Sequence, residues 1–358
     1  LTTAGAPHPA PQQALMGNSL LLLLSQARAA PPALSQAVQP PLDPLSWEEH
    51  WTTLGVLRDA GHLNHETRFS QLRLREPDKA AVWSWNEGEA IPRSSFAVVR
   101  QGSEAYEAVV DLVARELVSW SQLEGVYPNW LTEEFAAAVE AAMTHPEFIE
   151  GMKRRGIEDF TFIDCVAIPP GYFGTPEEKG RRLGHVRCTD ASGVRNPWPR
   201  QIEGLTVVVD GDKGEVVEVV DEGAPPLHST TADYDLASSG APREVPGPIH
   251  VEQPLGPGFV LDGHQVEWQN WSFHVRVDQR IGTVISTVTY SDGEDERPIL
   301  YQGHLSEIFV PYMDPGFAWH ARNFIDAGEF TGTGLFKPLM AGLDCPDHAV
   351  YFDSLNHA

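Results

Sequence analysis

The chain has 358 residues, of which 42% are apolar, enough for two or three domains with hydrophobic cores. Its 25 basic and 50 acidic side chains give a formal net charge of −25. Because such a surface repels phosphate groups, the composition excludes nucleic acid and anionic membranes as partners, while a cationic amine would be attracted. An acidic surface that serves solubility alone is the alternative interpretation.

Residues 1–40 are rich in Ala, Pro and Gln, with one apolar run, Leu20–Leu24. This run is too short to span a membrane, and no basic residue precedes it as in a signal peptide. We interpret residues 1–40 as a flexible or partner-wrapping arm and expect a cytoplasmic protein, with secretion left open. A helix over residues 17–30 that docks on another surface is the alternative.

Residues 41–130 predict a first small α+β domain. Ser46 is a favourable helix N-cap, because Glu48 and Glu49 follow in the first turn. The apolar positions of this helix share one face: Trp47, Trp51, Leu54 and Leu57. Strands are expected at 69–74, 81–85 and 95–100. The helical spacing of apolar residues in Ala105–Trp120 predicts a second helix.

Residues 131–222 predict a second small α+β domain. Thr132 is expected to cap one helix, and Pro146 to open another that ends at Gly156. Strands are expected at 160–167 and 182–188, followed by a hairpin of 205–210 and 215–220. Residues 223–263, dense in Pro and Gly, are expected to form a linker without regular structure.

Residues 264–358 begin with β-patterned segments, at 265–268, 271–277 and 282–290, and a strand leaves the acidic turn that starts at Ser291. Farther on, Asp326 follows Phe324 and Ile325. Burial in such an apolar context would raise the pKa of a carboxyl group and suit it to proton abstraction near neutral pH.

Short motifs follow one another in this region: Arg297-Pro-Ile, Ser306-Glu307, Val310-Pro311-Tyr312, Asp314-Pro315, Asp326-x-Gly328-Glu329 and Gly342-x-Asp344-Cys345. In this order they resemble the copper- and topaquinone-dependent amine oxidases. Segments 74–79 and 199–205 are similar to the two small domains of the same family. The resemblance implies oxidative deamination of a primary amine to an aldehyde, with release of ammonia and hydrogen peroxide.

The resemblance also implies roles for individual residues. Asp326 corresponds to the catalytic base, and Tyr312, 14 residues earlier, to the tyrosine beside the quinone. Phe324 corresponds to the gate of the substrate channel, to which we also assign Trp319. The alternatives are that Asp326 is a structural carboxylate capping a turn and that Tyr312 is an ordinary core tyrosine.

The family forms its quinone from a tyrosine in an Asn-Tyr motif and binds copper through a His-x-His pair and a third histidine. Neither Asn-Tyr nor His-x-His occurs in the 358 residues. We therefore expect a split enzyme, in which a second polypeptide carries topaquinone, the copper ligands and the C-terminal half of the catalytic domain. Two copies of each chain would form a heterotetramer. A cofactor-less binding or scaffold protein is the alternative.

The expected fold is thus α+β: two small α+β domains, followed by the first part of a large antiparallel β-sandwich that another chain completes. Left alone, such a sandwich would expose an unpaired edge and an apolar face. Cys165, Cys188 and Cys345 are too few for a disulfide scaffold. In the family, the cysteine at the position of Cys345 pairs with a later one, so Cys345 either pairs with another chain or stays a free buried thiol.

Overall fold

The computed structural model describes residues 39–171, 173–229, 233–241, 243–244, 246–247, 253–305, 309–320, 323–325, 339–340, 342–346, 349–353 and 355. These residues form helices and antiparallel sheets, which confirms the predicted α+β class. Within the described ranges, no helix is both long and apolar enough to cross a membrane. The predicted arm lies outside the described residues up to position 38.

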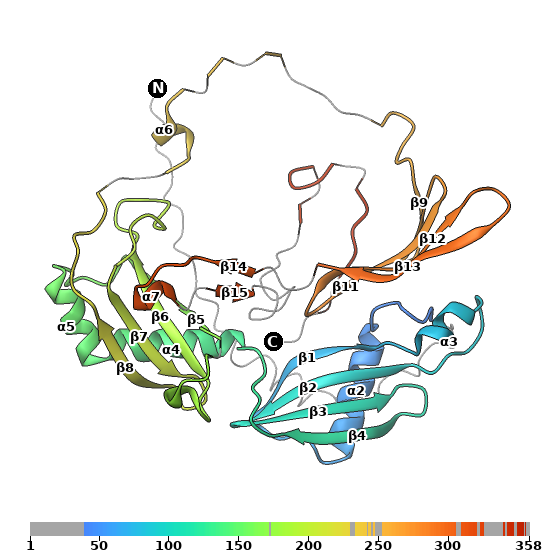
Figure 1. Ribbon diagram of the computed structural model, residues 1–358, viewed down its shortest axis with the longest axis horizontal. Coiled ribbons are helices and arrows are strands. Elements are labelled where there is room, and N and C mark those ends of the chain that lie inside the picture. The colour runs from blue at the N-terminus through green and yellow to red at the C-terminus, as the bar shows by residue number, and fades with distance from the viewer. Residues whose placement is uncertain are drawn as a thin grey trace, which may run out of the picture. The chain divides into compact units, whose positions relative to one another are not determined.

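The first domain is a four-stranded antiparallel meander packed against a long helix (Figure 1). Its strands follow one another in space as in sequence: β1 (Thr67–Arg75), β2 (Ser94–Gln101), β3 (Glu104–Asp111) and β4 (Glu116–Leu123). The helix α2 (Trp47–Asp59) begins after Ser46, as predicted. Ser46 and Glu49 form a capping box, in which the backbone N of Ser46 donates to Glu49 Oε2 at 2.8 Å.

The predicted apolar face of α2 is wrong in part. Leu57 is buried, but Trp47 is 55% exposed, and the buried face instead carries Glu49, His50 and Thr53. These polar groups have partners, since Glu49 pairs with buried Arg93 and Thr53 Oγ1 lies 2.7 Å from Ser95 Oγ. The spacing of apolar residues could not identify the buried face of α2, because this face consists largely of polar side chains that are buried through hydrogen bonds.

Two predicted elements of this domain are wrong. Residues 105–120 form the β3–β4 hairpin instead of a helix, because Asp111 Oδ1 accepts bonds from the backbone N of Val113 (2.9 Å) and Ala114 (2.8 Å) and so closes a turn. Residues 81–85 are not a strand but fall mostly in α3 (Lys79–Ser84), whose N-cap Asp78 accepts a bond from Ala80 N at 2.8 Å.

The second domain is another four-stranded meander, covered on one face by two helices. Its strands are β5 (Ile163–Ile168), β6 (Leu183–Asp190), β7 (Leu205–Asp210) and β8 (Glu215–Asp221), and its helices are α4 (Thr132–Thr144), α5 (Pro146–Arg154) and the short 3-10 helix η1 (Pro176–Glu178). The predicted start and end of α5 are confirmed: Pro146 is its first residue, and Gly156, just after its end, has a φ of +75°. For α4 the cap is Leu131, one residue before the predicted Thr132.

A disulfide joins Cys165 of β5 to Cys188 of β6, which lie directly opposite each other in the sheet. The sequence did not indicate this pair, because two cysteines 23 residues apart carry no pairing signal of their own. Cys345 is free and half-buried.

The third region contains a five-stranded antiparallel sheet and a separate strand pair. The sheet has the order β13 (Glu296–His304), β12 (Gly282–Ser291), β11 (Trp271–Asp278), β10 (Gln265–Trp268) and β9 (Val260–Asp262). The strands β14 (Phe309–Pro311) and β15 (Asn323–Ile325) pair with each other, and α7 (Phe317–His320) lies between them in sequence.

The predicted linker is not wholly irregular. It contains α6 (Leu236–Ser239), whose N-cap Asp235 accepts bonds from the backbone N of Ala237 (2.9 Å) and Ser238 (3.1 Å), and it includes β9. The predicted strands at 265–268, 271–277 and 282–290 are confirmed.

Candidate functional site

A cavity of about 260 Å³ lies on the face of the second domain's sheet that the helices leave open. In this sheet Val166 lies opposite Arg187, and Asp164 lies opposite Thr189. Because side chains alternate along a strand, these four residues project to the same face, while Ala167 and Val186 enter the core under the helices. All four line the cavity.

Two predicted site residues, Tyr312 and Trp319, form the other side of this cavity. Tyr312 follows β14 directly and is 52% exposed, and Trp319 belongs to α7. Their ring centroids are 5.4 Å apart with a tilt of 48°, so they act as one aromatic wall. The structure therefore brings together two of the predicted site residues.

Three contacts hold this aromatic segment against the sheet. The ring of Phe317 stacks on His185 of β6, with centroids 5.0 Å apart. The backbone N of Phe317 donates to Glu222 Oε2 at 3.0 Å, and Trp319 Nε1 donates to Glu203 Oε2 at 3.3 Å. The position of Tyr312 thus depends on residues of the second domain.

The other two predicted site residues are Phe324 and Asp326. Phe324 lies in the middle of β15, opposite Val310 of β14, so the chain returns next to the Tyr312 segment. Asp326 lies outside the described residues.

Burial controls the charges of Arg187 in the cavity wall and of its neighbour His185. It lowers the pKa of His185 to about 4, with the neighbouring Arg187 as the second cause, so the stacked imidazole is neutral at pH 7. Burial also lowers the pKa of Arg187 to about 10, opposed by the negative charge of Glu203 and by Tyr312. Arg187 therefore stays cationic, and within the described chain it has no hydrogen bond or ion pair.

The sequence did not select the cavity residues of the second domain, among them Asp164, Arg187, Trp198 and Gln201. A signal was present in the strand at 183–190, where His185, Arg187 and Thr189 alternate with buried small or apolar residues and mark a face that is not core. Nothing in that alternation indicated which segment covers the face.

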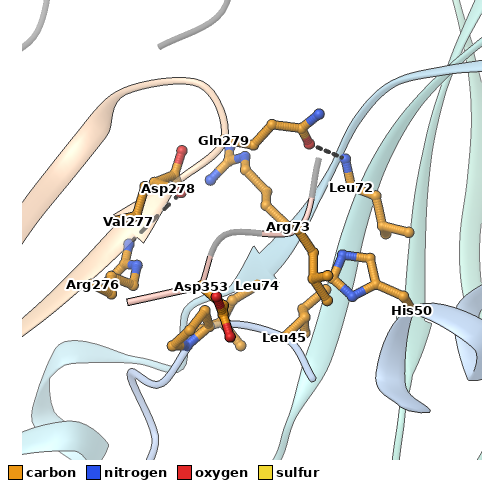
Figure 2. Close-up of a pocket in the computed structure, with 12 residues that line it drawn as sticks. Leu45, His50, Leu72, Arg73, Leu74, Arg276, Val277, Asp278, Gln279 and Asp353 are labelled. Atoms are coloured by element: carbon orange, nitrogen blue, oxygen red, sulfur yellow. Dashed lines mark hydrogen bonds and ion pairs between the residues drawn. The ribbon is translucent and has the colours of Figure 1, made fainter. Parts of the chain in front are cut away.

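A second cavity, of about 300 Å³, lies between β1 and the turn that joins β11 to β12 (Figure 2). Some of its polar groups bind one another: Gln279 Oε1 accepts a bond from Leu72 N at 3.1 Å, and Arg276 lies 3.9 Å from Asp278 and also pairs with Glu76. Two buried nitrogens of its lining residues, Arg73 Nε and Arg276 Nη1, have no hydrogen-bond partner within the described part of the chain. Neither Tyr312 nor Trp319 lines it. We therefore take the cavity beside Tyr312 as the candidate site.

The residues that the structure describes contain no group of three His, Cys, Asp or Glu side chains that could hold a metal ion.

Three family profiles match the chain in succession. The profile of the copper amine oxidase N2 domain matches residues 40–123, that of the N3 domain residues 133–237, and that of the copper amine oxidase enzyme domain residues 260–358. The candidate cavity thus combines side chains from the N3 match with Tyr312 and Trp319 from the enzyme-domain match.

Curated relatives match over most of the chain. It is 32% identical over 318 residues to a primary amine oxidase of Klebsiella aerogenes, covering 87% of this chain and 42% of that protein. It is 36% identical over 326 residues to the copper-containing amine oxidase gamma 1 of Arabidopsis thaliana, covering 88% and 45%. The chain thus spans a little under half the length of these two relatives.

Solved structures show the same fold. A copper-containing benzylamine oxidase from Hansenula polymorpha superposes with a TM-score of 0.71 at 23% identity, covering 86% of this chain and 51% of that one. A lysyl oxidase from Pichia pastoris gives a TM-score of 0.63 at 16% identity, covering 89% and 50%.

Proposed function

Because this chain belongs to the copper amine oxidase family, we propose that it forms the substrate entrance and supplies the catalytic base of a primary amine oxidase. The reaction consumes a primary amine, oxygen and water and gives an aldehyde, ammonia and hydrogen peroxide. The observation that carries the proposal is the meeting of Tyr312 and Trp319 in one cavity.

In this proposal, the residues of this chain accept a proton from the substrate, orient the reacting groups and shape the channel. Asp326 accepts a proton from the carbon that bears the amine, and the hydroxyl of Tyr312 orients the group that the amine attacks. Phe324 gates the channel, and Trp319 forms part of its apolar wall. Apolar walls exclude water, which strengthens every polar interaction inside the channel.

Copper and topaquinone belong, in this proposal, to a second polypeptide, with two copies of each chain in the assembly. When bound, the quinone would supply the electrophile and accept the electrons, and copper would serve in oxygen reduction.

Native mass spectrometry of the protein purified from its source, followed by phenylhydrazine labelling, tests this arrangement. We expect a complex in which a second chain carries copper and the hydrazine-reactive mass. A label on one longer polypeptide that includes this sequence would contradict the two-chain arrangement. An unlabelled, metal-free chain without a partner would show a non-catalytic binding or scaffold protein instead.

The role of Asp326 is tested in the assembled complex. Asp326→Asn is expected to lower amine turnover by about 10²- to 10⁴-fold, because the amide cannot accept the proton. Glu294→Gln, which removes a carboxylate from the exposed β12–β13 turn, is the matched control. Unchanged turnover in Asp326→Asn would disprove the assignment.

A further inference from the structure

The wall of the candidate cavity carries two opposite charges that do not pair. Arg187 faces Val166 across the β5–β6 ladder, whereas Asp164 faces Thr189 and is thus the diagonal neighbour of Arg187. Diagonal neighbours in an antiparallel sheet lie about 7 to 8 Å apart. No ion pair of 4.0 Å or less joins these two described residues.

The position of the Arg187 guanidinium carries a free-energy cost of desolvation. It is half-buried, and among the described residues it has neither a hydrogen-bond partner nor an ion-pair partner. Other buried arginines of the domain are fully engaged: Arg182, for example, donates to both carboxylate oxygens of Glu134 at 2.6 Å. A partly desolvated cation without a partner loses free energy that an acceptor group of a ligand can restore.

We propose that Arg187 holds an anionic group of the substrate, so that this cavity selects primary amines that also carry a carboxylate. Asp164 balances the charge of the wall, so the ammonium end of such a molecule is not repelled as it approaches. The surrounding rings of Trp198, Tyr312 and Trp319 pack on the methylene chain between the two charged ends.

The size of the site fits a small substrate. A volume of about 260 Å³ accommodates a short aliphatic chain. Short ω-amino acids combine the required length with one ammonium and one carboxylate. This inference rests on the proposed amine oxidase function and names the substrate class of the same site.

Three probes of equal chain length test the proposal on the assembled complex: γ-aminobutyrate, butylamine and putrescine. We expect Arg187→Gln to lower the ratio of kcat/KM for γ-aminobutyrate to that for butylamine at least about tenfold, because a hydrogen bond to a charged group is lost. The ratio of putrescine to butylamine should rise. Arg181→Gln, which removes an exposed arginine just before β6, is the control and should leave both ratios unchanged.

A binding measurement separates this proposal from the proposed function. Sodium butyrate should give saturation-transfer NMR signals with the complex, and Arg187→Gln should abolish them. Butyrate binding through Arg187 without turnover of any of the three amines would refute the amine oxidase function while leaving the carboxylate site intact. An equal decrease of kcat/KM for all three amines in Arg187→Gln would refute the carboxylate site. Butyrate binding that Arg187→Gln leaves unchanged would refute it as well.

Discussion

Two arginines of the second domain show how pairing decides the role of a buried charge. Arg155, whose side chain is 2% exposed, donates to Asp221 Oδ1 at 2.8 Å and to the carbonyl oxygen of Glu203 at 3.1 Å. The hydrogen bonds from Arg155, and secondarily from Arg154, hold the pKa of Asp221 far below its usual range. Arg155 therefore ties the end of α5 to the end of β8 and serves the fold.

Arg187 lies in the same domain without a hydrogen bond or ion pair to a described residue, and it lines the cavity together with Tyr312 and Trp319. The negative charge of Glu203 opposes the lowering of the Arg187 pKa, but no ion pair joins the two side chains, so the cost of desolvating the guanidinium is only partly offset. The contrast with Arg155 is the residue-scale reason to assign Arg187 to recognition and Arg155 to stability.

The buried imidazole of His185 predicts a pH dependence of stability. Its pKa is about 4 in the folded chain, lowered first by burial and then by Arg187, whereas an unperturbed histidine titrates near pH 6.5. Between these values the unfolded chain binds a proton that the folded chain does not. Stability therefore falls as the pH decreases from about 6.5 to 4, by at most about 1.4 kcal/mol per pH unit for this group.

Urea unfolding of the full chain across this pH range measures the effect. His185→Gln should reduce the slope, while some slope remains because burial also lowers the pKa of His50. His304→Gln, at the exposed end of β13, should keep the wild-type slope. Identical slopes in the two variants would show that protonation of His185 does not oppose folding.

At the scale of elements, the second domain is organised around close contact between an indole and two glycines. Trp130 packs on Gly184 of β6 and on Gly211, which follows β7. A Cβ atom at either glycine would lie 2.6 Å from the indole ring. The same ring lies under the guanidinium of Arg182, whose carbon is 5.1 Å from the ring centroid. Trp130 thus fixes the start of α4 to the centre of the sheet.

This contact makes Gly184 sensitive to a single methyl group. Gly184→Ala should destabilise the chain by about 1 to 3 kcal/mol, because the added carbon overlaps the indole and forces the ring to move. Gly258→Ala adds the same methyl group where no atom lies within 4 Å and should change stability by less than about 0.5 kcal/mol. Thermal unfolding of the two variants measures the difference in stability. Equal unfolding midpoints would show that Trp130 can shift without loss of stability.

Elements with local signals could be predicted from the sequence, and elements set by tertiary contacts could not. Ser46 and Pro146 mark helix starts through their own hydrogen-bonding chemistry, and both were correct. Residues 105–120 fit the helical period equally well, but pairing of β3 with β2 decided their structure. The turn at Asp111 contains no Gly, Pro or Asn, and Arg115 adopts a φ of +58° that its residue type does not announce.

The same distinction applies to the site. Tyr312 belongs to the motif Val310-Pro311-Tyr312, so the resemblance selected it, and Trp319 was assigned to the channel from the aromatic segment that follows. Asp164 and Arg187 reach the cavity only because the segment with α7 packs on the open face of another domain's sheet. That packing depends on Phe317 and Glu222, which are 95 residues apart, and no local pattern connects them.

At the scale of the whole molecule, the five-stranded sheet has one face that this chain leaves exposed. Along β12, Val284 and Ser286 are fully buried, while Ile285 between them is 38% exposed. On the neighbouring β13, Ile299 is exposed as well. Apolar residues on a sheet face are expected to lie against a second sheet, which fits the proposal that another polypeptide completes the β-sandwich.

A charge on this face should therefore prevent assembly. Ile285→Lys is expected to weaken binding of the second polypeptide at least about tenfold, since the ammonium would be buried without a partner. Folding of the chain itself should persist, because the side chain at 285 remains in solvent before assembly. Val113→Lys, in the exposed β3–β4 turn, is the matched control. Sedimentation of the mixed chains measures assembly, and circular dichroism verifies that each variant is folded. Wild-type assembly by a folded Ile285→Lys variant would mean that this face stays open in the complete enzyme.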